Sequence, residues 1–200
     1  MPIQRRAFET KRRILVSAVS LFSRYGLNGV SVDKIAAAAQ VNKQRIYAYY
    51  GSKTVLFEQC LVQIFEEVNS LEDNFHDITR DNLGEMTDIL LSHYINIHRQ
   101  VPAFWRLIAW ANLESSSSLE KLSGIKNKSL SYLNDLYQEG CRRGILRSEV
   151  SFDTYIFNIF AVSFFYQANR VTLSNTLSRG LFEQEGLSKL IHETAGLFKK

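Results

Sequence analysis

The 200-residue sequence predicts an all-α protein. It contains only two prolines, so little in it would interrupt long helices. Apolar residues recur at helical rather than strand spacing along much of the chain. Serine, asparagine and glycine stand between these apolar series, at positions where helices begin and end. We therefore expect helices nearly throughout.

The first apolar series predicts a helix from about Ile14 to Tyr25. Its members keep to one helix face: Ile14, Leu15, Ala18, Leu21, Phe22 and Tyr25. The segment Gly26–Gly29 has turn chemistry. Ser31 can cap a second helix through its hydroxyl. The buried stripe of this second helix consists of Val32, Ile35, Ala36 and Ala39.

A short third helix should begin after Asn42, which is a good cap, and end near Tyr49. Ile46 and Tyr50 can face inward because they lie four residues apart. The residues left facing outward are Lys43, Gln44, Arg45 and Ala48.

The fourth helix should run from Lys53, with Ser52 as its cap, to about Leu71. Its apolar residues form two stripes, and a helix that is apolar on two sides is packed on two sides. One stripe holds Leu56, Cys60, Ile64 and Leu71, and the other holds Phe57, Leu61, Phe65 and Val68. We interpret this helix as a bridge to the rest of the chain.

The remaining sequence predicts further helices joined by loops. The expected helices are Leu83–His98, one that begins near Pro102, Leu119–Cys141 with Ile125 inward, Ser151–Leu173 and Phe182–Phe198. The expected connections are Gly140 and Gly144 with Ile145–Val150, and Asn175–Gly180. Ser115–Ser118 is either a loop or the start of a helix.

The segment Tyr155–Tyr166 is the most apolar in the chain, with ten apolar or aromatic residues in twelve. It is too short to span a membrane. A buried strand is one interpretation, but few of its residues are β-branched, so we favour a helix. A helix that is apolar almost all round packs on its own core and on a partner, which favours a dimer. The alternative is a central helix of a monomer.

The positive charge is concentrated in the first third of the chain. Residues 1–60 hold ten Lys or Arg against three Asp or Glu, whereas residues 61–200 hold fourteen against seventeen. A basic module on a mildly acidic body suggests a polyanionic partner for that module. A solvated basic surface is the alternative.

Two short helices joined by a tight turn, with polar and basic residues at the start of the second, form a helix-turn-helix. Within Thr10–Leu56 one set of residues stands at fixed spacings: Ile14-Leu15, Ala18, Leu21-Phe22, Gly26, Ile35-Ala36, Gln40-Val41, Ile46-Tyr47-Ala48-Tyr49-Tyr50 and Ser52-Lys53. With these residues the segment resembles the DNA-binding region of the TetR family. One departure is Gln40, where the family has Gly and the backbone calls for positive φ. Another is Gln44-Arg45, where a small pair is commoner.

The resemblance implies a helix-turn-helix DNA-binding domain of three helices at residues 1–52. The residues it places at DNA are Thr10, Arg12, Arg13, Ser31, Asn42, Lys43, Gln44, Arg45, Tyr47, Tyr49 and Lys53. Lys43, Gln44 and Arg45 would face base edges, with Arg45 suited to guanine and Gln44 to adenine. Tyr47 and Lys53 would hold phosphates. For Tyr47 and Tyr49, core packing is the alternative.

The resemblance also implies a C-terminal helical ligand-binding and dimerisation domain at residues 53–200. The protein would then be a homodimeric repressor, released from a palindromic operator by a small molecule. Residues that could line an apolar pocket are Tyr94, Phe104, Trp105, Trp110, Phe164, Phe165, Tyr166 and Asn169. This lining would suit an apolar or aromatic effector, and simple core packing is the alternative.

Rival classes have less support. The sequence lacks the common nucleotide-binding, hydrolase and zinc-protease motifs, so we expect no enzyme, cofactor or metal site. Cys60 lies on an apolar stripe and is expected to be inert rather than redox-sensing. A nonspecific nucleic-acid-binding or helical protein-interaction module remains open. The basic N-terminus and the lack of a long apolar run predict no signal peptide and no membrane span. Two cysteines, Cys60 and Cys141, make no disulfide framework, so a reducing cytoplasm is the expected compartment.

Overall fold

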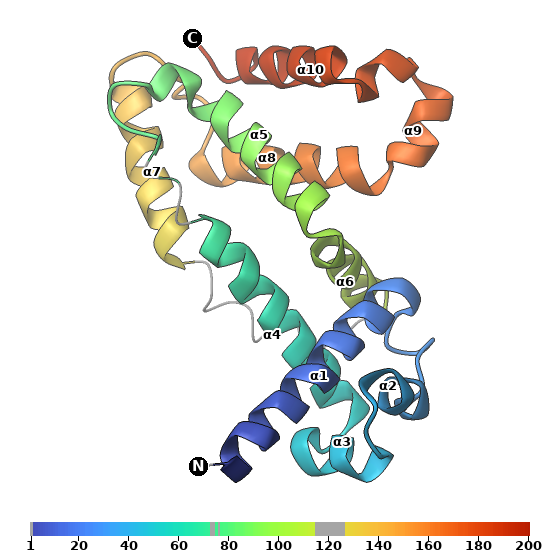
Figure 1. Cartoon of the computed structure of the whole chain (residues 1–200). Coiled ribbons are helices and arrows are strands. Elements are labelled where there is room, and N and C mark those ends of the chain that lie inside the picture. The colour runs from blue at the N-terminus through green and yellow to red at the C-terminus, as the bar shows by residue number, and fades with distance from the viewer. Residues whose placement is uncertain (1, 73–74, 76, 115–126) are drawn as a thin grey trace. The chain divides into compact units, whose positions relative to one another are not determined.

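The computed structural model describes residues 2–72, 75, 77–114 and 127–200. These residues form helices and no strand, so the prediction of an all-α fold is confirmed. The chain divides into two compact units (Figure 1). The first unit comprises Met1–Ser70 and Pro102–Ile125, and the second comprises Leu71–Val101 and Lys126–Lys200.

The first unit contains five of the labelled helices. They are α1 (Pro2–Tyr25), α2 (Val32–Ala39), α3 (Lys43–Tyr50), α4 (Lys53–Glu72) and α6 (Pro102–Leu113). Figure 1 shows the short helices α2 and α3 next to each other. Ile14, Ile35 and Ile46 are all fully buried, so one core joins α1, α2 and α3. The rings of Phe22 and Phe57 meet edge to face at 5.2 Å, which ties α4 to this core.

Helix α1 begins earlier than the apolar series predicted, at Pro2 rather than near Ile14. Its first turns have no continuous apolar stripe, and periodicity alone therefore cannot find them. The Arg5 side chain reaches the Glu9 carboxylate one turn later, at 3.3 Å, a pair that supports an exposed helix. Thr10 hydrogen-bonds the carbonyl oxygen of Arg6 at 2.8 Å.

Helix α4 has the predicted bounds and the predicted double burial. The apolar residues of both stripes up to Val68 are nearly or fully shielded from solvent. Phe65 on α4 meets Phe104 on α6 edge to face at 5.1 Å. Helix α4 is therefore buried along both apolar stripes.

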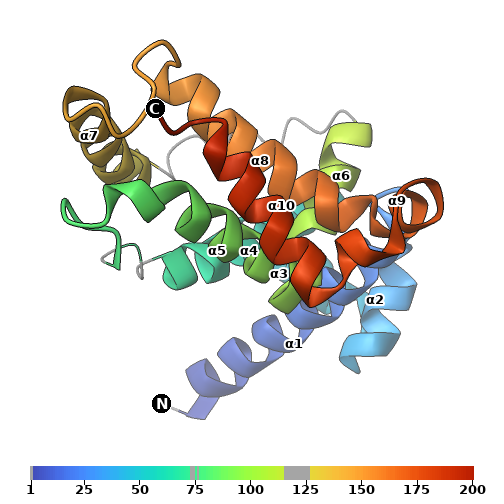
Figure 2. The same cartoon turned by 90° about the horizontal axis from the view of Figure 1, so that it is seen from above.

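The second unit contains the other five labelled helices (Figure 2), and several aromatic side chains are buried in its core. Its elements are the 3₁₀ turns η2 (Leu83–Glu85) and η4 (Arg179–Phe182), with α5 (Met86–Gln100), α7 (Asn127–Arg142), α8 (Phe152–Ala168), α9 (Arg170–Thr176) and α10 (Gln184–Gly196). Tyr155 stacks on Tyr137 at 4.5 Å and meets Phe198 edge to face at 5.2 Å. Its buried hydroxyl lies 3.0 Å from that of Thr87, and burial raises the pKa of Tyr155 well above its usual range.

The segment Tyr155–Tyr166 is helical, so the interpretation as a buried strand is wrong. Ser151 caps this helix as predicted, by accepting a hydrogen bond from the amide of Thr154 at 3.2 Å. The prediction of one helix to Leu173 is also wrong. At Asn169 the backbone leaves helical geometry, with φ −107° and ψ 11°, and the side-chain amide donates to the carbonyl of Phe165. Asparagine favours such local bonds over continued helix.

Three other boundaries differ from the prediction. Gly140 lies inside α7 rather than in a connection, and its missing side chain makes room for Leu146, which lies 2.7 Å from the position of a Cβ there. The expected loop Asn175–Gly180 overlaps the end of α9 and the start of η4, and α10 begins at Gln184. The serine run Ser115–Ser118, expected as a loop or a helix start, and the inward Ile125 lie outside the described residues.

Candidate nucleic-acid interface

Two side-chain caps define the helix pair α2–α3. The Ser31 hydroxyl accepts from the amide of Lys34 at 3.2 Å, and the Asn42 side-chain oxygen accepts from the amide of Arg45 at 2.9 Å. Between them Gln40 adopts a left-handed conformation with φ 53°, as its place in the motif predicted. These bonds fix where α3 begins and in which direction it leaves the turn.

Helix α3 rests on the first unit through one fully buried residue, Ile46. The side chains of Lys43, Gln44 and Arg45, in its first turn, are all exposed. The helix therefore presents donors of hydrogen bonds and positive charge at the surface, on the end where its own backbone N–H groups also point outward.

Lys43 has a partner that the sequence analysis did not predict. Its ammonium group lies 2.9 Å from the Asp33 carboxylate of α2. The hydrogen bond and charge of Asp33 raise the pKa of Lys43 above its ordinary value. Both side chains are largely exposed, and such surface pairs are weakly held, so the ammonium group can exchange this partner for another anion.

The three tyrosines of α3 have different environments. Tyr47 is exposed, whereas Tyr49 is half-buried with the Lys11 ammonium group 5.4 Å from its ring centre. Tyr50 donates its hydroxyl to the carbonyl oxygen of Lys11 at 3.0 Å, and burial raises its pKa to about 12. Tyr50 therefore ties α3 to α1, and Tyr47 is the most exposed of the three tyrosines.

Other predicted DNA contacts are distributed over α1 and α4. Arg12 and Arg13 are exposed and border one hollow together with Gln40. Thr10 is buried and uses its hydroxyl within α1. Lys53 donates from its ammonium group to the carbonyl oxygen of Val30 at 3.0 Å, which stabilises the turn before α2.

Glu114 is a residue that the sequence analysis missed. It follows α6, and its carboxylate accepts from the backbone amides of Leu27 and Asn28 at 2.9 and 3.1 Å. A Cβ atom on Gly26 would lie 2.7 Å from Trp110, so the close approach of α6 requires glycine there. No sequence pattern links positions so far apart in the chain. The carboxylate ties the end of α6 to the turn that leads into α2.

The predicted effector residues are divided between the two units. Phe104, Trp105 and Trp110 belong to α6, and the two tryptophans border an open hollow of about 660 Å³ with Arg24 and Tyr25 of α1. The set in the second unit consists of Tyr94, Phe164, Phe165, Tyr166 and Asn169.

Within the second unit these side chains have different roles. Tyr94 is buried and packs edge to face on Phe160 at 4.9 Å. Tyr166 is buried and stacks on Phe182 at 5.2 Å. Phe165 is 54% exposed, and Asn169 caps the end of α8.

The described residues form no cluster of metal-binding side chains, and the thiol of Cys60 is not activated. No group of three or more His, Cys, Asp or Glu side chains there could hold a metal ion. Cys60 is fully buried, and burial raises the pKa of its thiol far above the usual range, which makes it a poor nucleophile. None of the described helices is long and apolar enough to cross a membrane.

A capped surface helix that follows another helix across a tight turn is the architecture of helix-turn-helix DNA-binding proteins. Two family models match this chain and together identify it further. Residues 14–60 match the model for bacterial regulatory proteins of the tetR family. Residues 85–195 match the model for the tetracyclin repressor-like C-terminal domain. The chain therefore belongs to the TetR family of bacterial regulatory proteins, which are transcription regulators rather than enzymes.

Individual relatives agree with this assignment. The HTH-type transcriptional repressor NicS of Pseudomonas putida is 27% identical over 185 residues, which cover 90% of this chain and 85% of NicS. The HTH-type transcriptional repressor SCO4008 of Streptomyces coelicolor is 28% identical over 156 residues, which cover 77% of this chain and 76% of the relative. The crystal structure of SCO4942 from Streptomyces coelicolor has the same fold, with a TM-score of 0.69 at 21% identity over 94% of this chain and 98% of that protein.

Proposed function

We propose that this chain is a homodimeric transcriptional repressor that binds a palindromic operator and leaves it when a small molecule binds. The observation that carries the proposal is the surface of α3. Lys43, Gln44 and Arg45 are exposed on the first turn of a capped helix that Ile46 anchors. A major groove accepts a helix presented in this way. The relatives named as repressors favour repression over activation.

In this proposal some residues of α3 contact base edges and others contact phosphates. Arg45 suits the two acceptors of guanine, and Gln44 suits the acceptor and donor of adenine. Tyr47, which is exposed, would hold a phosphate, as would Arg12 and Arg13 on α1. Lys43 would exchange Asp33 for DNA. Ser31 and Asn42 would act through the caps that aim the helices.

The dimer would form through the second unit. Helix α8 exposes Phe157, Ala161 and Phe165 along one side, at helical spacing, and Phe157 is 68% exposed. In a monomer these apolar side chains are exposed to water, whereas a second copy of the chain would bury them. Two-fold symmetry would then set two copies of α3 on successive major grooves, about 34–36 Å apart.

The effector would be a largely apolar or aromatic molecule. Trp105 and Trp110 border a hollow in the first unit, and aromatic side chains dominate the second. An effector that binds more tightly to a state with poor operator affinity must lower the affinity of the protein for its operator, because the coupling between the two binding sites is reciprocal. Glu114 is well placed for such coupling, because it joins the end of α6 to the turn before α2. We further propose a cytoplasmic location, where bacterial DNA lies.

The decisive experiment selects preferred sequences from a random DNA pool and then measures affinity for the selected sequence over a range of salt concentrations. We expect a palindromic sequence with half-sites about one helical turn apart. Binding that depends on salt but enriches no sequence would contradict the proposal and favour a nonspecific nucleic-acid-binding protein. Absence of any DNA binding would favour a protein-interaction module.

A further inference from the structure

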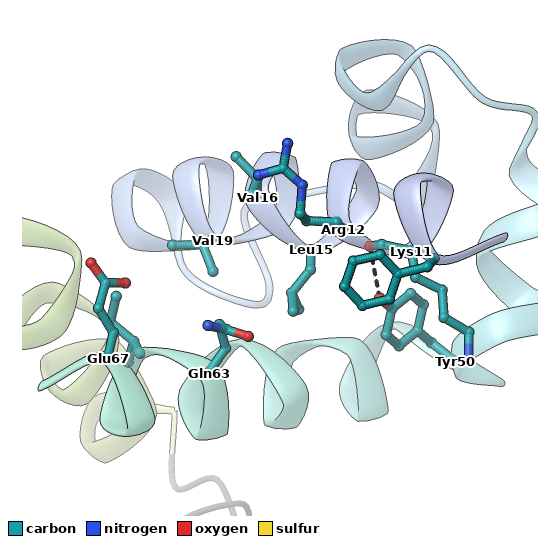
Figure 3. Close-up of a pocket in the computed structure, with 10 residues that line it drawn as sticks. Lys11, Arg12, Leu15, Val16, Val19, Tyr50, Gln63 and Glu67 are labelled. Carbon is teal, nitrogen blue, oxygen red and sulfur yellow. Dashed lines mark hydrogen bonds between the residues drawn. The ribbon is translucent and has the colours of Figure 1, made fainter. Parts of the chain in front are cut away.

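A third hollow lies in the first unit, between α1 and α4 (Figure 3), and of the side chains that line it only Arg12 has a role in the proposed DNA contacts. Its volume of about 630 Å³ lies in the range of small-molecule sites. The floor and walls are largely apolar, and they consist of Phe8, Leu15, Val16, Val19 and Ile64. Two of these are unusually exposed for large apolar side chains, Phe8 at 69% and Val16 at 59%.

The charged groups around this hollow are arranged unevenly. Lys11 and Tyr50 lie toward one end, and Gln63 and Glu67 lie toward the other (Figure 3). Arg12 adds a second cationic side chain to the lining, from α1. Tyr50 contributes no negative charge, because a tyrosine hydroxyl is protonated at neutral pH, and it donates a hydrogen bond to the Lys11 carbonyl oxygen.

We propose that this hollow binds an amphipathic organic anion. The apolar tail would cover Leu15, Val19 and Ile64, and the anionic head would lie by Lys11 and Arg12. Burial of apolar surface supplies the attraction for the tail. The basic side chains select the charge of the head, and the Glu67 carboxylate at the far end disfavours the reverse orientation.

Decanoate is a suitable probe, because it has an apolar tail and one carboxylate, and decanol is its uncharged counterpart. Binding is measured by titration calorimetry on the full chain, below the micelle-forming concentration of decanoate. We expect saturable binding of decanoate, and binding of decanol that is about threefold to tenfold weaker. Absence of saturable decanoate binding would overturn the proposal. The titration contains no DNA, so its outcome does not depend on the proposed function.

The charge arm of the test uses Val16, because this exposed side chain contributes little to the core of the unit. Val16→Glu and Val16→Lys remove the same side chain and differ in the sign of the charge that they add. We expect the Glu variant to bind decanoate at least threefold more weakly than the Lys variant, with decanol affected equally by both. Equal decanoate affinities would place the site elsewhere.

The shape arm uses a matched pair on α1. Val19→Trp fills the hollow, whereas Ser20→Trp adds the same bulk at the neighbouring, exposed position outside the lining. We expect the Val19 variant to lose at least tenfold in affinity for both probes and the Ser20 variant to bind them as the unaltered chain does. Retained binding in a Val19→Trp protein would contradict the assignment of the hollow, and so would equal losses in the two variants.

Discussion

Helices α3 and α8 both leave one side uncovered by the rest of their unit, but the chemistry of the two uncovered sides is opposite. Helix α3 buries Ile46 and exposes cationic and amide side chains. Helix α8 buries five residues and still exposes Phe157 and Phe165. A polar face can remain hydrated until a polyanion displaces water and counterions, whereas an aromatic face costs free energy until another apolar surface covers it. The contrast indicates a reversible partner for α3 and a permanent one for α8.

Phe157→Glu should produce the largest effect, because it places a charge in the proposed dimer interface. An unpaired buried charge costs several kcal/mol, and a symmetric interface contains two copies of the substitution. We expect the variant to be monomeric at micromolar concentration by analytical ultracentrifugation, with strongly weakened operator binding. Leu113→Glu, at another exposed apolar residue, is the control and should remain dimeric. A dimeric Phe157→Glu protein would show that α8 does not form the interface through this side.

The exposed faces also differ in how well the sequence predicted them. Around α3 the caps Ser31 and Asn42 and the buried Ile46 follow from local rules, because each depends on residues within one or two turns. The left-handed Gln40 was expected from the family resemblance. The apolar run of α8 predicted a helix and a buried role, but periodicity cannot find its break at Asn169. The resemblance to a family, rather than residue chemistry, supplied the roles of the individual DNA-facing side chains.

Contacts between distant positions account for what the sequence could not predict. Glu114 reaches back to Leu27 and Asn28, and Lys53 reaches the Val30 carbonyl. Such pairs depend on how helices pack, and no spacing rule encodes them. For a similar reason, the sequence cannot tell which of the proposed effector residues line a pocket and which only pack in the core. An aromatic side chain in a helical core has the same sequence pattern whether it packs on a neighbour, as Tyr94 does, or lines a hollow, as Trp110 does.

The second prediction tests whether the polar face of α3 reads bases. Arg45→Ala should reduce operator affinity by about 1–3 kcal/mol per half-site and relax one base position in each half-site. Binding to random DNA should change far less. Arg24→Ala, which removes one charge from the last turn of α1, controls for the loss of net charge. Both affinities are measured by fluorescence anisotropy. An equal loss of affinity for operator and random DNA would mean that Arg45 contacts only the DNA backbone.

The third prediction concerns the tie between α6 and the turn before α2. Glu114→Ala removes the acceptor of two backbone hydrogen bonds and leaves both amides to water, which should cost about 1 kcal/mol. The midpoint of thermal unfolding should fall by about 2–4 °C. Glu66→Ala, at an exposed position on α4, should leave it unchanged. An unchanged midpoint would show that the tie contributes nothing to stability. If operator affinity falls by more than unfolding explains, Glu114 also positions α2 and α3.

The smallest expected effect is that of Lys53→Gln, and it separates two roles of one ammonium group. If Lys53 leaves the Val30 carbonyl to hold a phosphate, the variant should bind operator and random DNA more weakly to a similar degree, by about 0.5–1 kcal/mol. The slope of log affinity against log salt should then decrease by about one per protomer. If the ammonium group stays on Val30, the slope should not change and the unfolding midpoint should fall instead. Lys189→Gln on α10 is the charge-matched control. Lys53 is therefore either a further DNA contact beside α3 or a structural residue that supports the turn before α2. The salt slope distinguishes the two roles.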